Sequence, residues 1–406
     1  MLYYYGEFMG KIKQCALVCQ SGGPTPAVNA TLCGVIRGAR DGGIKLYGAK
    51  NGILGVLENR ITDLGYLFGS PRSLSRLSST PGAALGSCRV RLPDDLDSAV
   101  YGEIFSYFDE HGVKYFFCIG GNDSMDTVAK LSAYAKKKSL DVSIIGIPKT
   151  IDNDLVLTDH TPGFGSAAKC VATAVCELWQ DVSSYNVPSV TVLEVMGRDT
   201  GWLGCACALP YYRFGYGATL VYLPEGAFSL DRFLGDVERG LSQGTPLLVC
   251  VSEGVGAVGA DGARDAFGHS DVSGACRLLA KEIKNNLRCK SRGVELSLMQ
   301  RCASHMASAT DISESEAIGE YSVSLALGGK SGKMSAFVRR QGEYGVDFCD
   351  VDAYLVANKT KYVPADFINS EGNFVTEKCI DYLSPLILGE RDARFEFGMP
   401  KHFRLK

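Results

Sequence analysis

The sequence contains no C-x-x-C pair, although it has 15 cysteines in 406 residues. Zinc sites and disulfide frameworks usually need such close pairs or regular spacing, and most of these cysteines lie inside apolar runs such as "CALVC" from Cys15. No apolar run approaches the ~18 residues of a membrane-spanning helix, and "MLYYYGEFMGKIK" lacks the basic start and apolar middle of a signal peptide. We therefore expect a cytoplasmic protein with reduced, buried thiols and no membrane partner.

A surplus of basic charge is also missing, because the formal net charge is -3. We expect no nucleic-acid partner, and a phosphate-bearing substrate would have to meet locally placed Arg and Lys. Nucleotide-binding motifs are absent as well. The segment "GGKSGKM" from Gly328 lacks the leading glycine of a P-loop, and "GFGSAA" from Gly163 follows "TDHTP" instead of a strand.

The sequence does contain short apolar runs that each end in a polar cluster, which is typical of buried strands. These runs are "CALVCQSGG", "YFFCIGGND", "SIIGIPKT", "SVTVLEVMGR", "ATLVYLPEG" and "TPLLVCVSEG". Helical patterns such as Asp126 to Lys138 lie between them, so the chain is expected to be an α/β protein with mainly parallel sheets. Its length, with 46% hydrophobic residues, favours two domains. The polar clusters should share one working face at the carboxyl ends of the strands.

Two regions give a weaker pattern. Gly254 to Gly268 is rich in Gly and Ala and indicates a mobile loop, with a linker as the alternative. After Gly332 the pattern loosens and suggests strand and loop that lead to a C-terminal cap.

Two glycine pairs follow predicted strands. In "SGGPTPAVNA" from Ser21, paired glycines would let main-chain amides approach an anion at a helix N-terminus; the alternative is a simple strand-to-helix turn. In "GGNDS" from Gly120, Asn122 and Asp123 could reach a phosphate-bound Mg²⁺, or could only cap a turn.

The segment "TIDND" gives a more specific signal. Thr150, Asp152 and Asp154 would alternate along an extended chain, with two carboxylates on one side. A carboxylate there can accept a proton from an attacking hydroxyl, which contributes about 10² to 10⁴ in rate. An Asx turn is the competing interpretation for Asn153 and Asp154.

Charged residues in later clusters suit a sugar phosphate. Arg198 in "MGRDTGW" could pair with phosphate, and Glu225 in "PEG" could accept from hydroxyls. "KSRGVELSLMQR" adds Lys290, Arg292 and Arg301; a solvated basic face is an equally good interpretation for Lys290.

In this order, the GG-x-x-P turn, GG-x-x-S, P-x-TIDND, MGR, PEG and Q-R motifs resemble the phosphofructokinase family from about Gly22 to Lys333. The resemblance implies two Rossmann-like three-layer αβα domains with the active site in the cleft between them, Mg²⁺, and transfer of a phosphoryl group to O1 of fructose 6-phosphate in glycolysis. It implies Asp152 as the general base and Asn122 at the metal position. It implies donor contact by Gly23, and sugar-phosphate contacts by Thr150, Ile151, Asp152, Met196, Gly197, Arg198, Glu225, Arg292 and Arg301.

The donor is indicated by two charges that resemble the pyrophosphate-dependent branch of this family. Asp123 and Lys149 stand where ATP-dependent members have glycine. Asp123 would close the space for a nucleotide α-phosphate, and Lys149 would neutralise a pyrophosphate leaving group. The resemblance therefore implies reversible transfer from pyrophosphate. The alternatives are an ATP-dependent phosphofructokinase and a noncatalytic regulatory subunit of the same fold.

The resemblance also implies a domain division and an assembly. We expect residues 10–155 with about 300–345 to bind pyrophosphate and Mg²⁺, and about 156–299 with 346–406 to bind the sugar phosphate and form the cap. The assembly is expected to be a homodimer or homotetramer.

Overall fold

The computed structural model describes residues 14–255 and 274–405. Its larger sheet has the order β11-β10-β5-β4-β1-β2-β3. The five central strands are parallel, whereas the edge strands β3 and β11 pair antiparallel with β2 and β10. The bounds are β1 Cys15–Gln20, β2 Lys45–Ala49, β3 Ile61–Asp63, β4 Val113–Gly120, β5 Ser143–Pro148, β10 Lys333–Arg339 and β11 Val346–Asp352.

A smaller, entirely parallel sheet has the order β7-β8-β6-β9. Its strands are β6 Ser189–Val195, β7 Leu220–Tyr222, β8 Leu247–Ser252 and β9 Lys290–Glu295; β12 Phe395–Glu396 and β13 Met399–Pro400 form a separate hairpin. Each of the six apolar runs in the sequence is a strand at the predicted place. They are buried because side chains on both faces of a parallel sheet are covered by helices.

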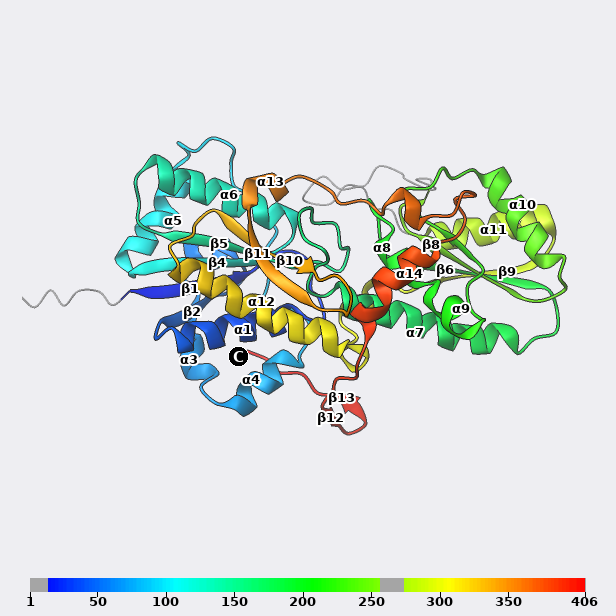
Figure 1. Ribbon diagram of the computed structural model, residues 1–406, viewed down its shortest axis with the longest axis horizontal. Helices are drawn as coiled ribbons and strands as arrows, with labels where there is room; N and C mark the ends of the chain where they lie inside the picture. Colours follow the sequence, from blue (N-terminus) through cyan, green and yellow to red (C-terminus); the bar gives the residue numbers. More distant parts are fainter. Residues whose placement is uncertain (1–13, 256–273, 406) are drawn as a thin grey trace, which may run out of the picture.

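Helices cover both faces of each sheet, and the two sheets form two lobes of the molecule (Figure 1). The α-helices are α1 Val28–Asp41, α2 Ile53–Leu57, α3 Leu64–Leu67, α4 Pro71–Ser78, α5 Ala99–Glu110, α6 Asn122–Lys137, α7 Phe164–Ser183, α8 Trp202–Ala206, α9 Leu209–Phe214, α10 Leu230–Leu241, α11 Ala275–Leu287, α12 Ala309–Leu327, α13 Ala353–Val356 and α14 Glu377–Leu383. The short 3₁₀ helices are η2 Ser297–Arg301, η3 Ser304–Met306, η4 Ala365–Phe367 and η5 Ser384–Ile387. No helix within the described ranges is long and apolar enough to cross a membrane.

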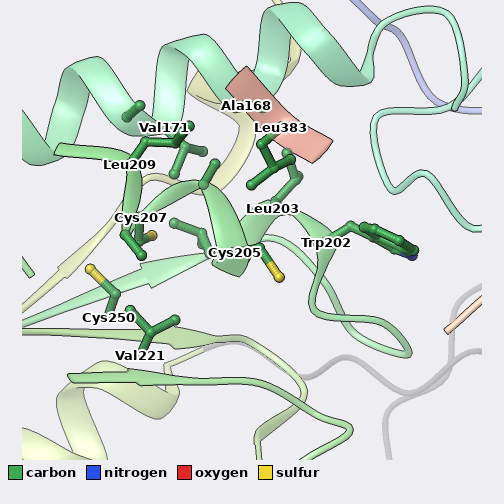
Figure 2. Packing of buried hydrophobic residues seen from close by; sticks show 14 of the residues in the cluster. Ala168, Val171, Trp202, Leu203, Cys205, Cys207, Leu209, Val221, Cys250 and Leu383 are labelled. Atoms are coloured by element: carbon green, nitrogen blue, oxygen red, sulfur yellow. The ribbon is translucent and has the colours of Figure 1, made fainter. Parts of the chain in front are cut away.

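The cores explain these layers. Apolar residues of α1 and α12 pack on one face of the larger sheet, and those of α5 and α6 pack on the other. On the smaller sheet, α7, α8 and α14 cover one face, and α10 and α11 cover the other. Figure 2 shows the cluster between the smaller sheet and helices α7, α8 and α14. In this cluster Val171 and Leu383 lie over Cys250 and Val221, and Trp202 lies to one side in this view. The prediction of two three-layer α/β units is confirmed.

The division at residue 346 was wrong in part. The sequence assigned 346–406 to the second unit, yet β11 pairs with β10 at the edge of the larger sheet. A short turn joins β10 to β11, and such connections place consecutive strands antiparallel and adjacent. Near the C-terminus, Phe403 also packs on Phe68 of the first unit, with ring centroids 5.2 Å apart.

Two further predictions fall wholly or partly outside the described residues. The N-terminal "MLYYYGEFMGKIK" lies outside the described residues, and so does the Gly254 to Gly268 loop beyond Val255. The helix expected from Asp126 begins earlier, at Asn122, because the chain turns directly from β4 into α6 at Gly121.

Candidate active site

A cavity of about 420 Å³ opens at the carboxyl ends of strands from both sheets. The segments that follow β1, β4, β5, β6 and β8 line it, as expected for ligand sites in parallel α/β sheets. The predicted site residues that line it are Gly23, Asn122, Asp123, Lys149, Thr150, Ile151, Asp152, Met196, Arg198 and Arg301. The site is therefore built from segments far apart in sequence.

Lys149 forms one wall of this cavity and is buried against the first glycine turn. Its ammonium donates to the carbonyl of Gly23 at 2.8 Å. Gly22 has a φ of +79°, and a Cβ there would lie 2.9 Å from Lys149 Nζ, so the turn requires glycine at this position. Burial lowers the pKa of Lys149 to about 8, and Arg301 acts in the same direction, although Asp152 opposes the shift. A cation thus faces the cavity near neutral pH.

The loop after β5 differs from the extended segment expected for "TIDND". The main-chain amide of Asp152 donates to Thr150 Oγ1 at 3.0 Å, and the Thr150 hydroxyl donates to Asp152 Oδ2 at 3.3 Å. Asn153 then adopts a left-handed conformation with a φ of +52°. The hydroxyl of Thr150 competes with the extended backbone and turns the chain, as Thr often does locally. Asp152 and Asp154 nevertheless both line the cavity.

A third carboxylate, Glu253, joins these two aspartates in the cavity wall. Burial raises the pKa of Glu253 to about 7, and the charge of Asp152 adds to this shift. Burial and then Asp152 likewise raise the pKa of Asp154 to about 7. The three acids therefore do not all carry full charge at neutral pH. Sequence reasoning missed Glu253, although it ends the run "TPLLVCVSEG" just as Glu225 ends its own.

Glu225 itself is occupied elsewhere. Its carboxylate accepts from the main-chain amide of Gly201 at 3.0 Å and from that of Val363 at 2.9 Å. It does not line the cavity. Its carboxylate supports two backbone segments, and the expected contact with a sugar hydroxyl stays a prediction.

Gly197 and Arg292 are also not part of the cavity lining. Gly197 shapes the turn behind Met196, with a φ of +135° and no room for a Cβ, which would lie 2.5 Å from the Thr200 carbonyl oxygen. Arg292 pairs with Asp181 at 3.2 Å, and both side chains are about half exposed. It lies in the middle of the edge strand β9 opposite Thr191, not at the carboxyl end where the cavity opens.

Asn122 provides a test of whether this site suits a divalent cation. Its amide nitrogen donates to the carbonyl of Lys359 at 2.5 Å, while its Oδ1 is buried and has no hydrogen-bond partner. The carboxylates of Asp123, Asp152 and Asp154 line the same cavity. Such oxygen ligands suit Mg²⁺, which also keeps several waters. A second acidic group, Glu194 with Cys276 and Glu295, fits a metal less well, because Glu194 accepts from the amide of Cys276 at 2.9 Å.

Comparison with known proteins agrees with this geometry. The sequence profile of the family described as "Phosphofructokinase" matches residues 15–326. The chain belongs to the phosphofructokinase family. It is 40% identical to a pyrophosphate--fructose 6-phosphate 1-phosphotransferase of Halomonas elongata over 96% of both chains. It is 38% identical to the protein of the same name from Methylococcus capsulatus, over 96% of this chain and 95% of that one.

Solved structures of this family show the same fold. The crystal structure of a pyrophosphate-dependent phosphofructokinase from Nitrosospira multiformis superposes with a TM-score of 0.88 at 34% identity, and the match covers 97% of each chain. The profile of the family ends within α12. The carbonyl of Lys359, which holds Asn122, therefore comes from a part of the chain that the phosphofructokinase profile does not match.

A buried histidine lies behind the loop of this phosphofructokinase site. His160 Nδ1 is 2.9 Å from Asp159 Oδ2, and its Nε2 is 2.9 Å from Glu314 Oε2. Burial disfavours the charged ring, but the hydrogen bonds to both carboxylates raise the pKa of His160 above its ordinary 6.5. Arg339 Nε also donates to both carboxylate oxygens of Asp159, each at 3.1 Å. The histidine thus closes an ionic network between α12 and the segment that follows the TIDND loop.

This network predicts that stability depends on pH. Because the folded state binds the His160 proton more tightly than the unfolded chain, its contribution is complete below pH 6.5 and is lost as pH rises through the raised folded pKa. His160→Gln should lower the free energy of unfolding by about 2–3 kcal/mol at pH 6, and by less at higher pH. Urea unfolding at a series of pH values measures this difference. The exposed His111→Gln is the control, and a pH-independent difference would contradict the assignment.

Proposed function

We propose that this protein transfers a phosphoryl group reversibly from pyrophosphate to O1 of fructose 6-phosphate, giving fructose 1,6-bisphosphate and phosphate in glycolysis. The observation that carries this proposal is that Asp123 and Lys149 line one cavity together with Asp152. The names of the similar proteins support the same reaction. Other residues that line the cavity supply groups for the phosphoryl donor, the acceptor and the metal ion.

The donor end is formed by the start of α6 and by Lys149. Asp123 lies in the first turn of α6, where the helix dipole favours an anion. In ATP-binding relatives of this architecture a phosphate could use that position, whereas here a carboxylate takes it and repels a nucleotide α-phosphate. Lys149, next to Gly23, would neutralise the charge that develops on the departing phosphate.

The acceptor end would place the sugar 1-hydroxyl beside Asp152, which takes its proton during in-line attack. Arg198 and Arg301 line the cavity and suit the 6-phosphate, because guanidinium groups bind phosphate in a bidentate manner. Ile151 and Met196 also line the cavity, and the resemblance implies that they contact the sugar. Binding energy on the 6-phosphate would hold the reacting oxygen in place.

A Mg²⁺ ion would be held by Asn122 Oδ1 and neighbouring carboxylates. When bound, it supplies positive charge that neutralises the pyrophosphate oxygens. We also propose that the protein is cytoplasmic and forms a homodimer or homotetramer, and light scattering would measure the assembly.

The donor is tested by measuring formation of fructose 1,6-bisphosphate from fructose 6-phosphate with pyrophosphate and, separately, with ATP. We expect product with pyrophosphate and formation of pyrophosphate in the reverse direction from fructose 1,6-bisphosphate and phosphate. Product with ATP alone would overturn the proposal in favour of an ATP-dependent enzyme. An inactive homo-oligomer that gains activity only with a second chain would indicate a regulatory subunit.

Substitutions of Glu253 and Glu225 should have different effects, the first on KM and the second on stability. If Glu253 accepts from a sugar hydroxyl, Glu253→Gln is expected to raise KM for fructose 6-phosphate by at least ~10-fold at about pH 8, where its carboxylate is charged, because such a charged acceptor contributes about 1.5–3 kcal/mol. Glu225→Gln should instead lower the thermal midpoint with little change in KM, since its carboxylate holds the amides of Gly201 and Val363. Steady-state kinetics and thermal unfolding of both variants measure this. An equal KM effect of the two substitutions would contradict these roles.

A further inference from the structure

A short C-terminal segment, residues 358–361, contacts both ends of the cavity. Asn358 and Thr360 line the cavity wall, and the carbonyl of Lys359 accepts from Asn122 at the donor end. At the other end, the main-chain amide of Lys361 donates to the carbonyl of Asp154 at 2.7 Å. We call residues 358–361 the bridging segment. It lies beyond the part of the chain that the family profile matches.

The side chain of Lys361 points from this segment to the back of the TIDND loop. Its ammonium donates to Asn153 Oδ1 at 3.1 Å, to the Thr158 carbonyl at 3.2 Å and to the Asp159 carbonyl at 2.8 Å. An ammonium has three donors, so these bonds use all of them. The charge also lies 5.1 Å from the centre of the Trp202 ring, whose indole nitrogen donates to the Lys361 carbonyl at 2.9 Å.

Lys361 binds Asn153, the residue at which the TIDND loop turns. Asn153 is fully buried and left-handed, between Asp152 and Asp154. Its amide nitrogen donates to Tyr382 Oη at 2.9 Å, so both ends of its side chain are fixed by C-terminal residues. Left-handed backbone is unfavourable for residues other than glycine, although Asn tolerates it best, and such a conformation persists where its surroundings hold it.

We propose that Lys361 is a positioning residue for Asp152, acting through Asn153 and the carbonyls of Thr158 and Asp159 without touching substrate. This inference rests on the proposed role of Asp152 as base. If the ammonium is removed, all three oxygens lose a bond in a place that water reaches poorly, and among the described residues only the Asp159 carbonyl keeps a second donor, Tyr382 Oη at 2.7 Å. The loop can then relax, and a shift of about 1 Å at a reacting group can cost ~10² in rate.

The protonation of Lys361 agrees with this role. Burial lowers its pKa to about 8, while Asp159 and Asp154 favour the charged form. The groups that face it are therefore those two carboxylates together with Arg339, which lowers the pKa further.

Lys361→Met tests the proposal, because Met keeps an unbranched side chain against Trp202 and removes the charge. We expect kcat to fall by at least ~10-fold, while KM for fructose 6-phosphate and for pyrophosphate changes less than about threefold. Lys361→Ala should regain part of its kcat when ethylammonium is added. Lys378→Met is the matched control, since Lys378 is largely exposed in the same C-terminal region and pairs only with Asp366 among the described residues.

A measurement that needs no turnover separates this inference from the proposed function. Hydrogen exchange of the peptide that spans residues 150–163 should be faster in Lys361→Met than in the wild type, and unchanged in Lys378→Met. Faster exchange would support the positioning role even if the wild type used ATP instead of pyrophosphate. Unchanged exchange, or a loss of kcat fully explained by a smaller folded fraction, would overturn it.

Discussion

Asp152→Asn is expected to lower kcat for transfer from pyrophosphate to fructose 6-phosphate by at least ~10², with KM for both substrates nearly unchanged. The amide of Asn has the shape of the carboxylate but cannot accept the proton of the sugar hydroxyl. Its main-chain bonds should persist, because Thr150 Oγ1 accepts from the amide of residue 152 at 3.0 Å and Thr200 Oγ1 donates to its carbonyl at 3.3 Å. The substitution therefore removes the proton acceptor and keeps its position.

The control for Asp152→Asn is Asp41→Asn, an exposed aspartate at the end of α1 whose side chain pairs with Arg40. Thermal unfolding should show both variants folded at the assay temperature. If Asp152→Asn kept more than about a tenth of the wild-type kcat, Asp152 would not be the base. Glu253 would then be the next candidate, since its carboxyl group lines the same cavity and its pKa is raised to about 7.

The sheets and most of the cavity could be predicted from local sequence. Each apolar run ends in a polar cluster because buried parallel strands carry apolar side chains on both faces and open to solvent at their carboxyl ends. Gly23, Asp123, Lys149 and Asp152 follow such runs directly, so their meeting at one edge depended only on strand direction. This part of the site is a consequence of topology.

What could not be predicted depends on tertiary partners. Glu225 and Glu253 end two similar runs. Only the fold decides that Glu225 accepts from the main-chain amides of Gly201 and Val363 away from the cavity, whereas Glu253 lines the cavity and accepts from the amide of Gly197 at 3.4 Å. Arg292 has the composition of a phosphate ligand, but its place in the middle of β9 turns it toward Asp181.

The contact between the C-terminal region and the TIDND loop could not be predicted from the sequence either. Lys361 lies in "NKTKYVP", where nothing distinguishes it from the exposed Lys359 two residues earlier. Its role follows from three carbonyl oxygens that converge from Asn153, Thr158 and Asp159, which are more than 200 residues away along the chain. Spacing rules cannot detect such a contact, because they act over a few residues of one helix or strand.

Asp123→Gly combined with Lys149→Gly should lower kcat with pyrophosphate by ~10² or more and give measurable transfer from ATP. Removal of Asp123 frees the first turn of α6 for a nucleotide α-phosphate, and removal of Lys149 withdraws a buried cation whose loss should cost about as much as an oxyanion-hole donor. The effect on pyrophosphate should come mainly from Lys149, and the admission of ATP mainly from Asp123.

The single variants and Lys149→Met decide whether this division of roles is right. Lys149→Met keeps the volume beside Gly22 and Gly23, so it separates loss of charge from collapse of the glycine turn, where the Lys149 ammonium now holds the Gly23 carbonyl at 2.8 Å. We expect Lys149→Met to lose the pyrophosphate reaction without gaining ATP, and Asp123→Gly to keep more of the pyrophosphate reaction while ATP begins to compete. An unchanged rate with pyrophosphate in the double variant would contradict both roles. If ATP binding appeared in Lys149→Met but not in Asp123→Gly, the donor would be selected by the cation and not by the carboxylate at the start of α6.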